Sequence, residues 1–201
     1  MEGGIVIDIL MSLPGLFTAI IFHELAHGYV SYKLGDSTAK DAGRLTLNPL
    51  KHIDPVGLIF MLIFKFGWAK PVPINPSNYK KRKRDTILVS IAGPLTNYAI
   101  AILMGLILNL IPIRNAIVFQ VLLFTLWYNI MLGTFNLLPF PPLDGSKIVA
   151  SLLPVKYEYY FYKYERYLYI ILLILIATNI INKLLGPIID VVINVLIRFL
   201  T

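Results

Sequence analysis

Long stretches without a charged side chain are the feature that most constrains this sequence. No charge occurs in Leu10–Phe22, in Ile87–Ile111 or in Ala116–Leu138, and a helix needs roughly 20 apolar residues to cross a bilayer core. Only 14% of the residues are charged, whereas a soluble domain usually carries about a quarter. Lipid must therefore cover much of the surface, and we predict an all-α polytopic membrane protein.

The apolar segments also predict how many times the chain crosses the membrane. The expected spans are 5–34, 87–111, 116–138 and a shorter fourth span, 168–181. Residues 187–200 form either a fifth span or an amphipathic surface helix. We therefore predict a bundle of about four to six transmembrane helices, in a single domain that covers residues 1–201.

Basic residues predict the orientation of these spans. The segments 33–52, 65–85 and 147–166 hold 15 of the 18 Lys and Arg residues, and such segments usually lie on the cytoplasmic side. We interpret the run Lys80–Arg84 as an anchor at the lipid bilayer, because no aromatic-interleaved basic patch accompanies it. The cell membrane is the expected location, and no nucleic acid partner is expected.

Two irregular segments are predicted near the cytoplasmic face. The apolar run 55–64 is too short to cross, and basic loops flank it, so a re-entrant segment fits best. The stretch 67–79 contains three prolines and should be extended. It could offer a short β-like edge to an unfolded substrate, or it could be a plain loop. A short helix over 146–153 and an interfacial aromatic tract over 157–167 are also expected.

The motif His23-Glu24-Leu-Ala-His27 follows the first charge-free run. On a helix, positions i and i+4 share a face, so His23 and His27 can bind one metal ion. Glu24 lies close enough to act as a general base on a water molecule that the metal activates. The alternative is a set of buried polar side chains paired with other helices, which is costly in an apolar helix.

A zinc hydrolase needs a third protein ligand, and Asp144 is the best local candidate. It follows a span and a stretch with three prolines, and Gly145 permits a sharp turn after it. Asp144 could instead cap the short helix that follows. His52 and the other acidic residues remain possible ligands, and His52 could also support the site from a distance or be plain polar surface.

These motifs together carry a resemblance. The segments HELAH, GRLTLNPLKHIDPVG, AGPLTN and NLLPFPPLDG resemble the site-2 protease family of intramembrane zinc metalloproteases. The resemblance implies one zinc ion per chain, held by His23, His27 and Asp144 near the cytoplasmic face, with Glu24 as the catalytic base. It maps the family's Gly-Pro-x-x-Asn motif onto Gly93, Pro94 and Asn97, and it implies that Asn97 binds the substrate backbone or the oxyanion.

Further expectations concern the substrate and the rival functions. The chain resembles a short, core-only member without PDZ or CBS domains, from a prokaryote. The expected substrate is a single-pass transmembrane protein or a signal-peptide remnant. Asn136 is a second candidate for substrate contact, and Asn97 could alternatively join helices. A metal transporter and a non-catalytic zinc-binding scaffold are the alternatives. Two nitrogens and a carboxylate would also accept cobalt or manganese.

Overall fold

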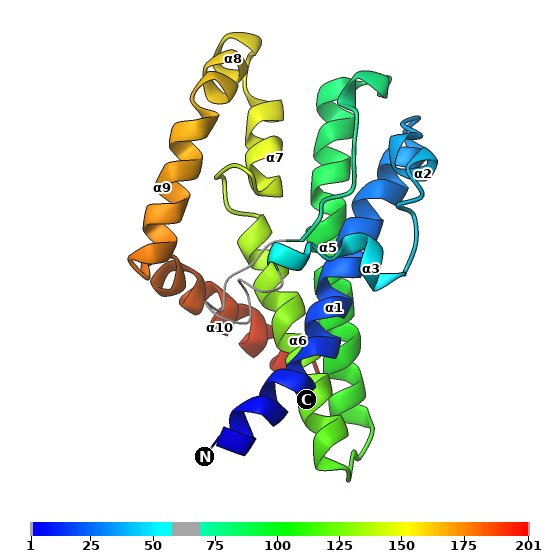
Figure 1. The fold of residues 1–201 in the computed structure, drawn as a ribbon. Coiled ribbons are helices and arrows are strands. Elements are labelled where there is room, and N and C mark those ends of the chain that lie inside the picture. Colours follow the sequence, from blue (N-terminus) through cyan, green and yellow to red (C-terminus); the bar gives the residue numbers. More distant parts are fainter. Residues whose placement is uncertain (1, 58–68, 201) are drawn as a thin grey trace.

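Three long helices form the centre of the molecule (Figure 1). They are α1 (Glu2–Lys33), α5 (Arg82–Leu110) and α6 (Ala116–Asn136), in a computed structural model that describes residues 2–57 and 69–200. These three are also the helices, within those ranges, that are long and apolar enough to cross a membrane. The prediction of a helical membrane protein is confirmed.

Small residues let the three helices pack closely. A Cβ atom on Gly15 of α1 would lie 2.7 Å from the backbone nitrogen of Thr125 on α6. A Cβ on Gly133 of α6 would lie 3.3 Å from the carbonyl oxygen of Pro94 on α5. In lipid, the hydrophobic effect contributes little to helix association, so helices associate largely through the van der Waals contacts that close backbone approaches allow.

The connection between α5 and α6 is short, so the two helices run antiparallel as neighbours. Asn115 caps α6, and its side-chain oxygen accepts hydrogen bonds from the backbone N–H groups of Ile117 and Val118 at 2.9 and 3.1 Å. Large apolar side chains remain exposed along the outer faces, among them Leu103 of α5 and Phe119 of α6. Lipid is the solvent that accommodates such a surface.

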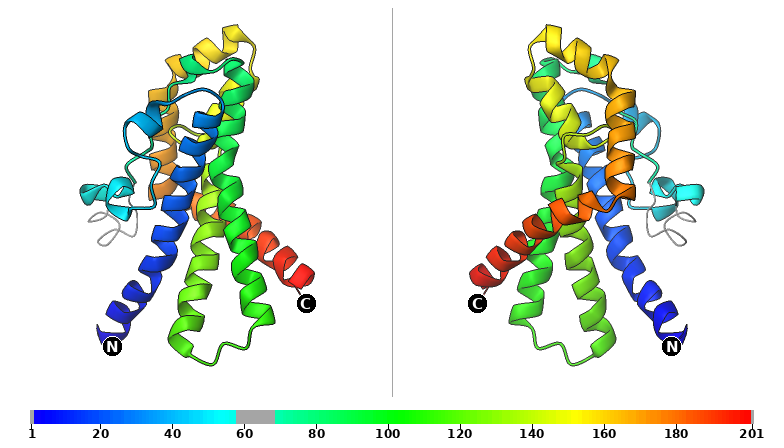
Figure 2. Two further views of the ribbon diagram at one scale, coloured as in Figure 1. Left: turned by 90° about the vertical axis from the view of Figure 1, so that its right-hand side faces the viewer. Right: turned by 90° about the vertical axis from the view of Figure 1, so that its left-hand side faces the viewer.

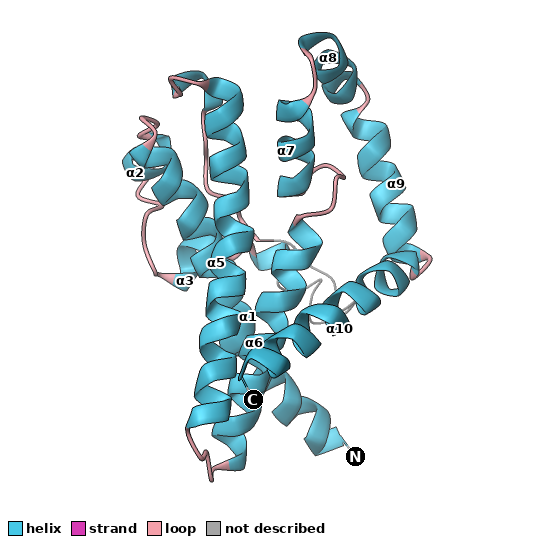
Figure 3. Ribbon diagram, turned by 180° about the vertical axis from the view of Figure 1, so that it is seen from behind, coloured by secondary structure: helices cyan, strands magenta, loops and turns pink. Residues whose placement is uncertain are grey.

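Shorter helices follow the central bundle. The chain turns into α7 (Asp144–Leu152) and α8 (Val155–Lys163), then returns along α9 (Glu165–Ala177) to α10 (Ile180–Leu200), as Figure 3 shows. The predicted helix over 146–153 is thus confirmed as α7. Figure 2 shows α10 running obliquely to the bundle, and whether its 187–200 portion crosses the membrane stays a prediction.

The predicted fourth span, 168–181, is wrong as a single helix. The helix α9 ends at Ala177 after 13 residues, or about 20 Å at 1.5 Å per residue, which is less than a bilayer core. The chain then turns at Asn179, whose φ of 60° is left-handed, and α10 begins in a new direction. Asparagine tolerates this conformation better than other non-glycine residues, and apolar periodicity gave no sign of it.

A proline-rich segment, residues 69–79, runs along α1, and we call it the strap. It contains no strand, and neither does the rest of the described chain. Its only ladder-like feature is an isolated antiparallel bridge between Ile53 and Ala69. The strap is extended as predicted up to Asn75, but Pro76–Asn78 forms a 3-10 turn (η1), because the Asn75 side chain accepts a hydrogen bond from Ser77 N. Most of the predicted re-entrant segment, 55–64, lies outside the described residues.

Parts of all three predicted basic segments lie at one end of the bundle. The end of α1, the short helix α2 (Thr38–Asp41), the start of α5 and the helix α8 all lie there (Figure 1). Arg82 and Lys83 at the start of α5 form ion pairs with Glu158 of α8, at 2.6 and 3.0 Å. This end is the one that we expect to face the cytoplasm.

Candidate metal centre

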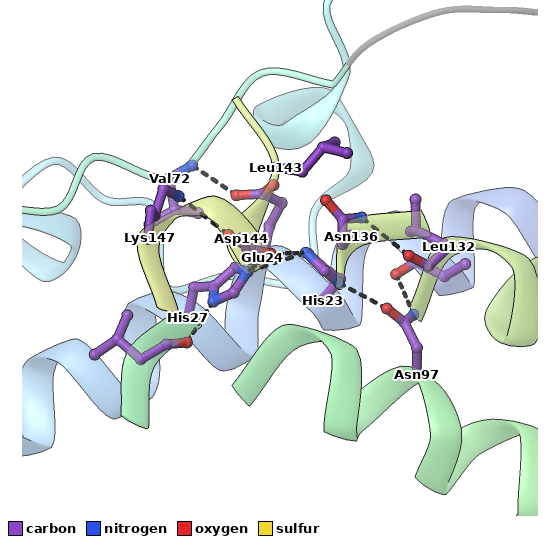
Figure 4. A network of polar contacts seen from close by, with 12 residues as sticks. His23, Glu24, His27, Val72, Asn97, Leu132, Asn136, Leu143, Asp144 and Lys147 are labelled. Atoms are coloured by element: carbon purple, nitrogen blue, oxygen red, sulfur yellow. Dashed lines mark hydrogen bonds and ion pairs between the residues drawn. The ribbon is translucent and has the colours of Figure 1, made fainter. Parts of the chain in front are cut away.

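His23 and His27 of α1 converge with Asp144 at the start of α7 (Figure 4). The two Nε2 atoms lie 2.9 Å apart, and Oδ2 of Asp144 lies 3.0 Å from His23 Nε2 and 2.9 Å from His27 Nε2. All three residues are buried. Among the described residues, this is the one group of three His, Cys, Asp or Glu side chains arranged to hold a metal ion.

The second nitrogen of each imidazole determines what the first can do. His23 Nδ1–H donates to Oδ1 of Asn97 at 2.6 Å, and His27 Nδ1–H donates to the carbonyl oxygen of Val89 at 2.7 Å. Because both partners are acceptors, both Nδ1 atoms carry a proton, and the neutral rings present lone pairs at Nε2. Two lone pairs and a carboxylate oxygen therefore point at one another, and a proton or a metal cation must lie between them.

The spacing of these atoms suits a metal. Zinc bonds to nitrogen and oxygen of about 2.0–2.1 Å in a tetrahedral arrangement place the ligand atoms roughly 3.3 Å apart. The observed separations of 2.9 to 3.0 Å need to widen by only a few tenths of an ångström. Two imidazoles and one carboxylate leave a fourth tetrahedral position open.

Asp144 is held in place by the loop before it and by the turn after it. Leu138 and Leu143 of the loop are buried in an apolar cluster with Leu172 of α9 and Leu185 of α10. A Cβ atom on Gly145 would lie 2.2 Å from the carbonyl oxygen of Leu137, so only glycine allows α7 to begin this close to the loop. The helices α9 and α10 thus help to position the carboxylate.

Gly93 of α5 forms one wall of the site. A Cβ atom at this position would lie 2.5 Å from His27 Nε2 and 2.7 Å from His23 Nε2, which no side chain can tolerate. The absence of a side chain at Gly93 therefore leaves the space in which the histidine nitrogens point. The motif that begins with Gly93 thus has a steric role beside the metal ligands.

Asn97 supports His23 from α5. Its Nδ2 group donates to the carbonyl oxygen of Ala19 at 3.0 Å and to Oδ1 of Asn129 on α6 at 2.9 Å, while Oδ1 accepts from His23. Asn97 and Asn129 are both fully buried. Each polar atom of the Asn97 amide is therefore engaged within the protein, which favours a role in orienting His23.

Asn136 lies at the end of α6, near the site in Figure 4. Its Nδ2 group donates to the carbonyl oxygen of Leu132, one helical turn earlier, at 3.1 Å. The side chain is partly buried. The proposed substrate contact of Asn136 stays a prediction.

Glu24 is held by the strap. Its Oε2 atom accepts a hydrogen bond from the backbone N–H of Val72 at 2.7 Å. Pro71 and Pro73 flank Val72 and have no N–H to offer, so Val72 supplies the backbone donor of this short stretch. The sequence motif identifies Glu24, but nothing in the local pattern reveals its partner.

The strap is itself anchored at several points. Lys70 N–H donates to the carbonyl oxygen of His52 at 2.9 Å, and the Arg44 guanidinium donates to the carbonyl oxygen of Lys70 at 2.8 Å. His52 is fully buried, and its Nε2 atom lies 2.7 Å from the carbonyl oxygen of Thr46. His52 therefore joins the loop that contains Thr46 to the strap, and it does not belong to the cluster of three potential ligands.

Asp36 anchors the far half of the strap. This fully buried carboxylate accepts hydrogen bonds from Asn75 N at 2.8 Å, Asn78 Nδ2 at 2.7 Å, and Ser31 Oγ at 2.8 Å, and from the backbone and hydroxyl of Thr38. Burial opposes ionisation of Asp36, but these hydrogen bonds outweigh burial and hold the pKa of the carboxyl well below its usual range.

Comparison with known proteins agrees with this site. The model of peptidase family M50 matches residues 107–179. A Bacillus subtilis protein named "Putative zinc metalloprotease YwhC" is 40% identical over 183 residues, covering 87% of this chain and 84% of that protein. The chain belongs to peptidase family M50. The resemblance to site-2 proteases is confirmed.

Other relatives carry similar names. "Putative zinc metalloprotease Rip2" of Mycolicibacterium smegmatis is 26% identical, over 87% of this chain and 69% of that protein. "Putative zinc metalloprotease MJ0611" of Methanocaldococcus jannaschii is 31% identical, over 70% and 69%. No solved structure matches the chain. Membership of a peptidase family favours an enzyme over the metal transporter and the non-catalytic scaffold.

Proposed function

We propose that this chain is an intramembrane zinc metalloprotease that hydrolyses a peptide bond within or near the transmembrane segment of a membrane protein. The observation that carries the proposal is the convergence of His23 Nε2, His27 Nε2 and Asp144 Oδ2, beside Glu24 and among helices that can span a bilayer. The names of the relatives support zinc as the metal, and the single cluster of three ligands among the described residues supports one ion per chain.

Two imidazoles and one carboxylate would bind the metal. The two neutral imidazoles, fixed by Asn97 and Val89, and the Asp144 carboxylate would bind zinc. Together these three ligands carry one net negative charge. When bound, zinc supplies Lewis acidity, which acidifies water to a pKa of about 7 and polarises a carbonyl group.

Glu24 is the proposed general base. Its carboxylate would accept a proton from the attacking water as the water oxygen bonds to the scissile carbonyl carbon. It would then deliver that proton to the leaving amide nitrogen as the carbon–nitrogen bond breaks. The Val72 N–H fixes one carboxylate oxygen and leaves the other available for this proton.

The proposed substrate is a single-pass transmembrane protein or a signal-peptide remnant in the cell membrane of a prokaryote. The bacterial and archaeal sources of the relatives support a prokaryotic origin. The site would lie near the cytoplasmic face, since α7, which begins at Asp144, stands toward the basic end of the bundle (Figure 1).

The test uses purified full-length protein in proteoliposomes with a tagged single-pass protein whose transmembrane helix contains Gly and Pro near its basic end. The wild type should cleave inside that helix, and Glu24→Gln should reduce cleavage by about 10²–10⁴-fold while zinc stays at one per chain. A substrate with an all-leucine helix serves as the control. Undiminished cleavage by Glu24→Gln would refute the proposal, as would cleavage confined to soluble loops.

A further inference from the structure

A basic hollow of about 280 Å³ lies where α1 leaves the bundle and α5 enters it. Its lining comes from the end of α1 and from the start of α5, and consists of Lys33, Leu34, Gly35, Lys80, Lys81, Arg84 and Asp85. The catalytic residues and the strap anchors are not part of it. Four cations and a single carboxylate therefore surround one small concave space.

The cations of this hollow are not neutralised by the protein in the way that their neighbours are. Arg82 and Lys83 pair with Glu158 of α8. In contrast, Lys33, Lys80 and Lys81 form no ion pair within the described part of the chain, and Asp85 pairs only with Arg84, at 3.3 Å. The hollow thus keeps an excess of three positive charges.

Burial and a hydrogen bond fix the backbone on one side of the hollow. Asp85 is buried, with 3% of its surface exposed, and its Oδ2 atom accepts a hydrogen bond from the backbone N–H of Lys81 at 2.9 Å. This bond caps the start of α5 and fixes the backbone from which Lys81 and Arg84 extend. The positive end of the α5 dipole adds to the field of the side chains.

The depth of the hollow identifies its occupant. Lys33 is the last residue of one candidate span, Ile7–Lys33, and Arg82 is the first residue of another, Arg82–Leu110. With these two helices crossing a bilayer, the hollow would lie at the level of the lipid phosphates, where both helices end. Basic pockets between membrane helices bind anionic head groups at this depth.

We propose that this hollow binds the phosphate head group of an anionic phospholipid, with Lys33, Lys80, Lys81 and Arg84 as the contacts. The acyl chains would lie against the exposed apolar side chains at this end of the spans, such as Leu88. The proposal rests on the membrane assignment and does not depend on the proteolytic activity.

The experiment measures thermal unfolding of the full chain by circular dichroism in detergent, with added phosphatidylglycerol, phosphatidylcholine or inorganic phosphate. A Lys33→Gln/Lys80→Gln/Lys81→Gln variant removes the charge of the hollow. The matched control is Lys51→Gln/Lys156→Gln/Lys163→Gln, which removes the same charge from exposed lysines elsewhere.

Phosphatidylglycerol should raise the Tm of the wild type and of the control variant by roughly 5 °C at saturation, and should leave the Tm of the hollow variant unchanged. Phosphatidylcholine and inorganic phosphate should have little effect. Equal shifts in both triple variants would overturn the proposal in favour of general surface attraction. An equal shift with inorganic phosphate would overturn the lipid assignment.

A second measurement does not depend on the variants. Native mass spectrometry of the wild type, released from micelles with equal phosphatidylglycerol and phosphatidylcholine, should show one retained phosphatidylglycerol per chain. Equal retention of the two lipids would contradict the proposal.

Discussion

The backbone N–H of Val72 donates to the Glu24 carboxylate at 2.7 Å, across 48 residues of sequence. The donor lies on an extended strap and the acceptor on a long apolar helix. The hydrogen bond thus joins the proposed catalytic base to a segment that contributes no catalytic side chain. Orientation of Glu24 depends on the strap, and the strap depends on Asp36 and Arg44.

Replacing Val72 with proline should impair catalysis without removing the metal. Val72→Pro deletes the N–H in a stretch already rich in proline, and a hydrogen bond to a charged group is worth about 1.5–3 kcal/mol. We expect kcat to fall by roughly tenfold or more, with zinc content unchanged. Val72→Ala, which keeps the N–H, should retain most of the activity. Equal kcat values for the two variants would show that this hydrogen bond does not orient the base.

Removal of any one ligand should abolish stable zinc binding. His23→Ala and Asp144→Ala each leave two protein ligands from a set of three, so the metal content of detergent-purified protein should fall from one zinc per chain to near zero. Glu24→Gln is the control, and should keep its zinc. If Asp144→Ala retained zinc, another residue would have to serve as the third ligand, and His52 and Asp54 would be tested next.

Gly93→Ala should weaken metal binding by steric pressure. The added methyl would lie 2.5 Å from His27 Nε2, and overpacking of this kind costs about 1–3 kcal/mol, or roughly 5- to 150-fold in zinc affinity. Gly186→Ala on α10 is the matched control, because nothing lies within 4 Å of its added Cβ. Competition with a chelator measures both affinities, and an unchanged value for Gly93→Ala would contradict this account of the wall.

Asn97→Ala distinguishes orientation of His23 from contact with substrate. Loss of the 2.6 Å hydrogen bond should lower zinc affinity by about 10–100-fold, as removal of a partner behind a metal ligand usually does. Asn129→Ala should have a smaller effect in the same direction, since Asn129 acts through Asn97. If activity fell while zinc affinity stayed at the wild-type value, Asn97 would act on the substrate or the oxyanion instead.

Asp36 should make the fold sensitive to acid. Its folded-state pKa is lowered, so its contribution to stability is present above the unfolded pKa of about 3.9 and is lost as the pH falls toward the folded-state value. The Tm difference between wild type and Asp36→Asn should therefore be greatest above about pH 5 and should shrink below about pH 4. The control is Asp54→Asn, at a partly buried loop position where, among the described residues, Oδ1 accepts hydrogen bonds only from the backbone N–H groups of Val56 and Gly57. A difference that does not change with pH would exclude this role for the Asp36 charge.

The sequence by itself determined the features that depend on neighbouring residues. Uncharged runs predicted the helices α1, α5 and α6, because length and apolarity decide whether a helix can cross lipid. The four-residue spacing of His23 and His27 predicted two ligands on one face. The prolines predicted that the strap is largely extended. Each of these inferences depends on local geometry alone.

Only the tertiary structure decided which distant groups meet. The local sequence made Asp144 the best candidate for the third ligand, and packing of its loop against α9 and α10 brings its carboxylate to the two histidines. The close approach of Gly93 and the partner of Glu24 were likewise invisible in the sequence. The break at Asn179 went unpredicted because the polar pair Thr178-Asn179 is short and apolar residues lie on both sides of it. Such features arise from contacts between residues far apart in the chain, and no local pattern encodes them.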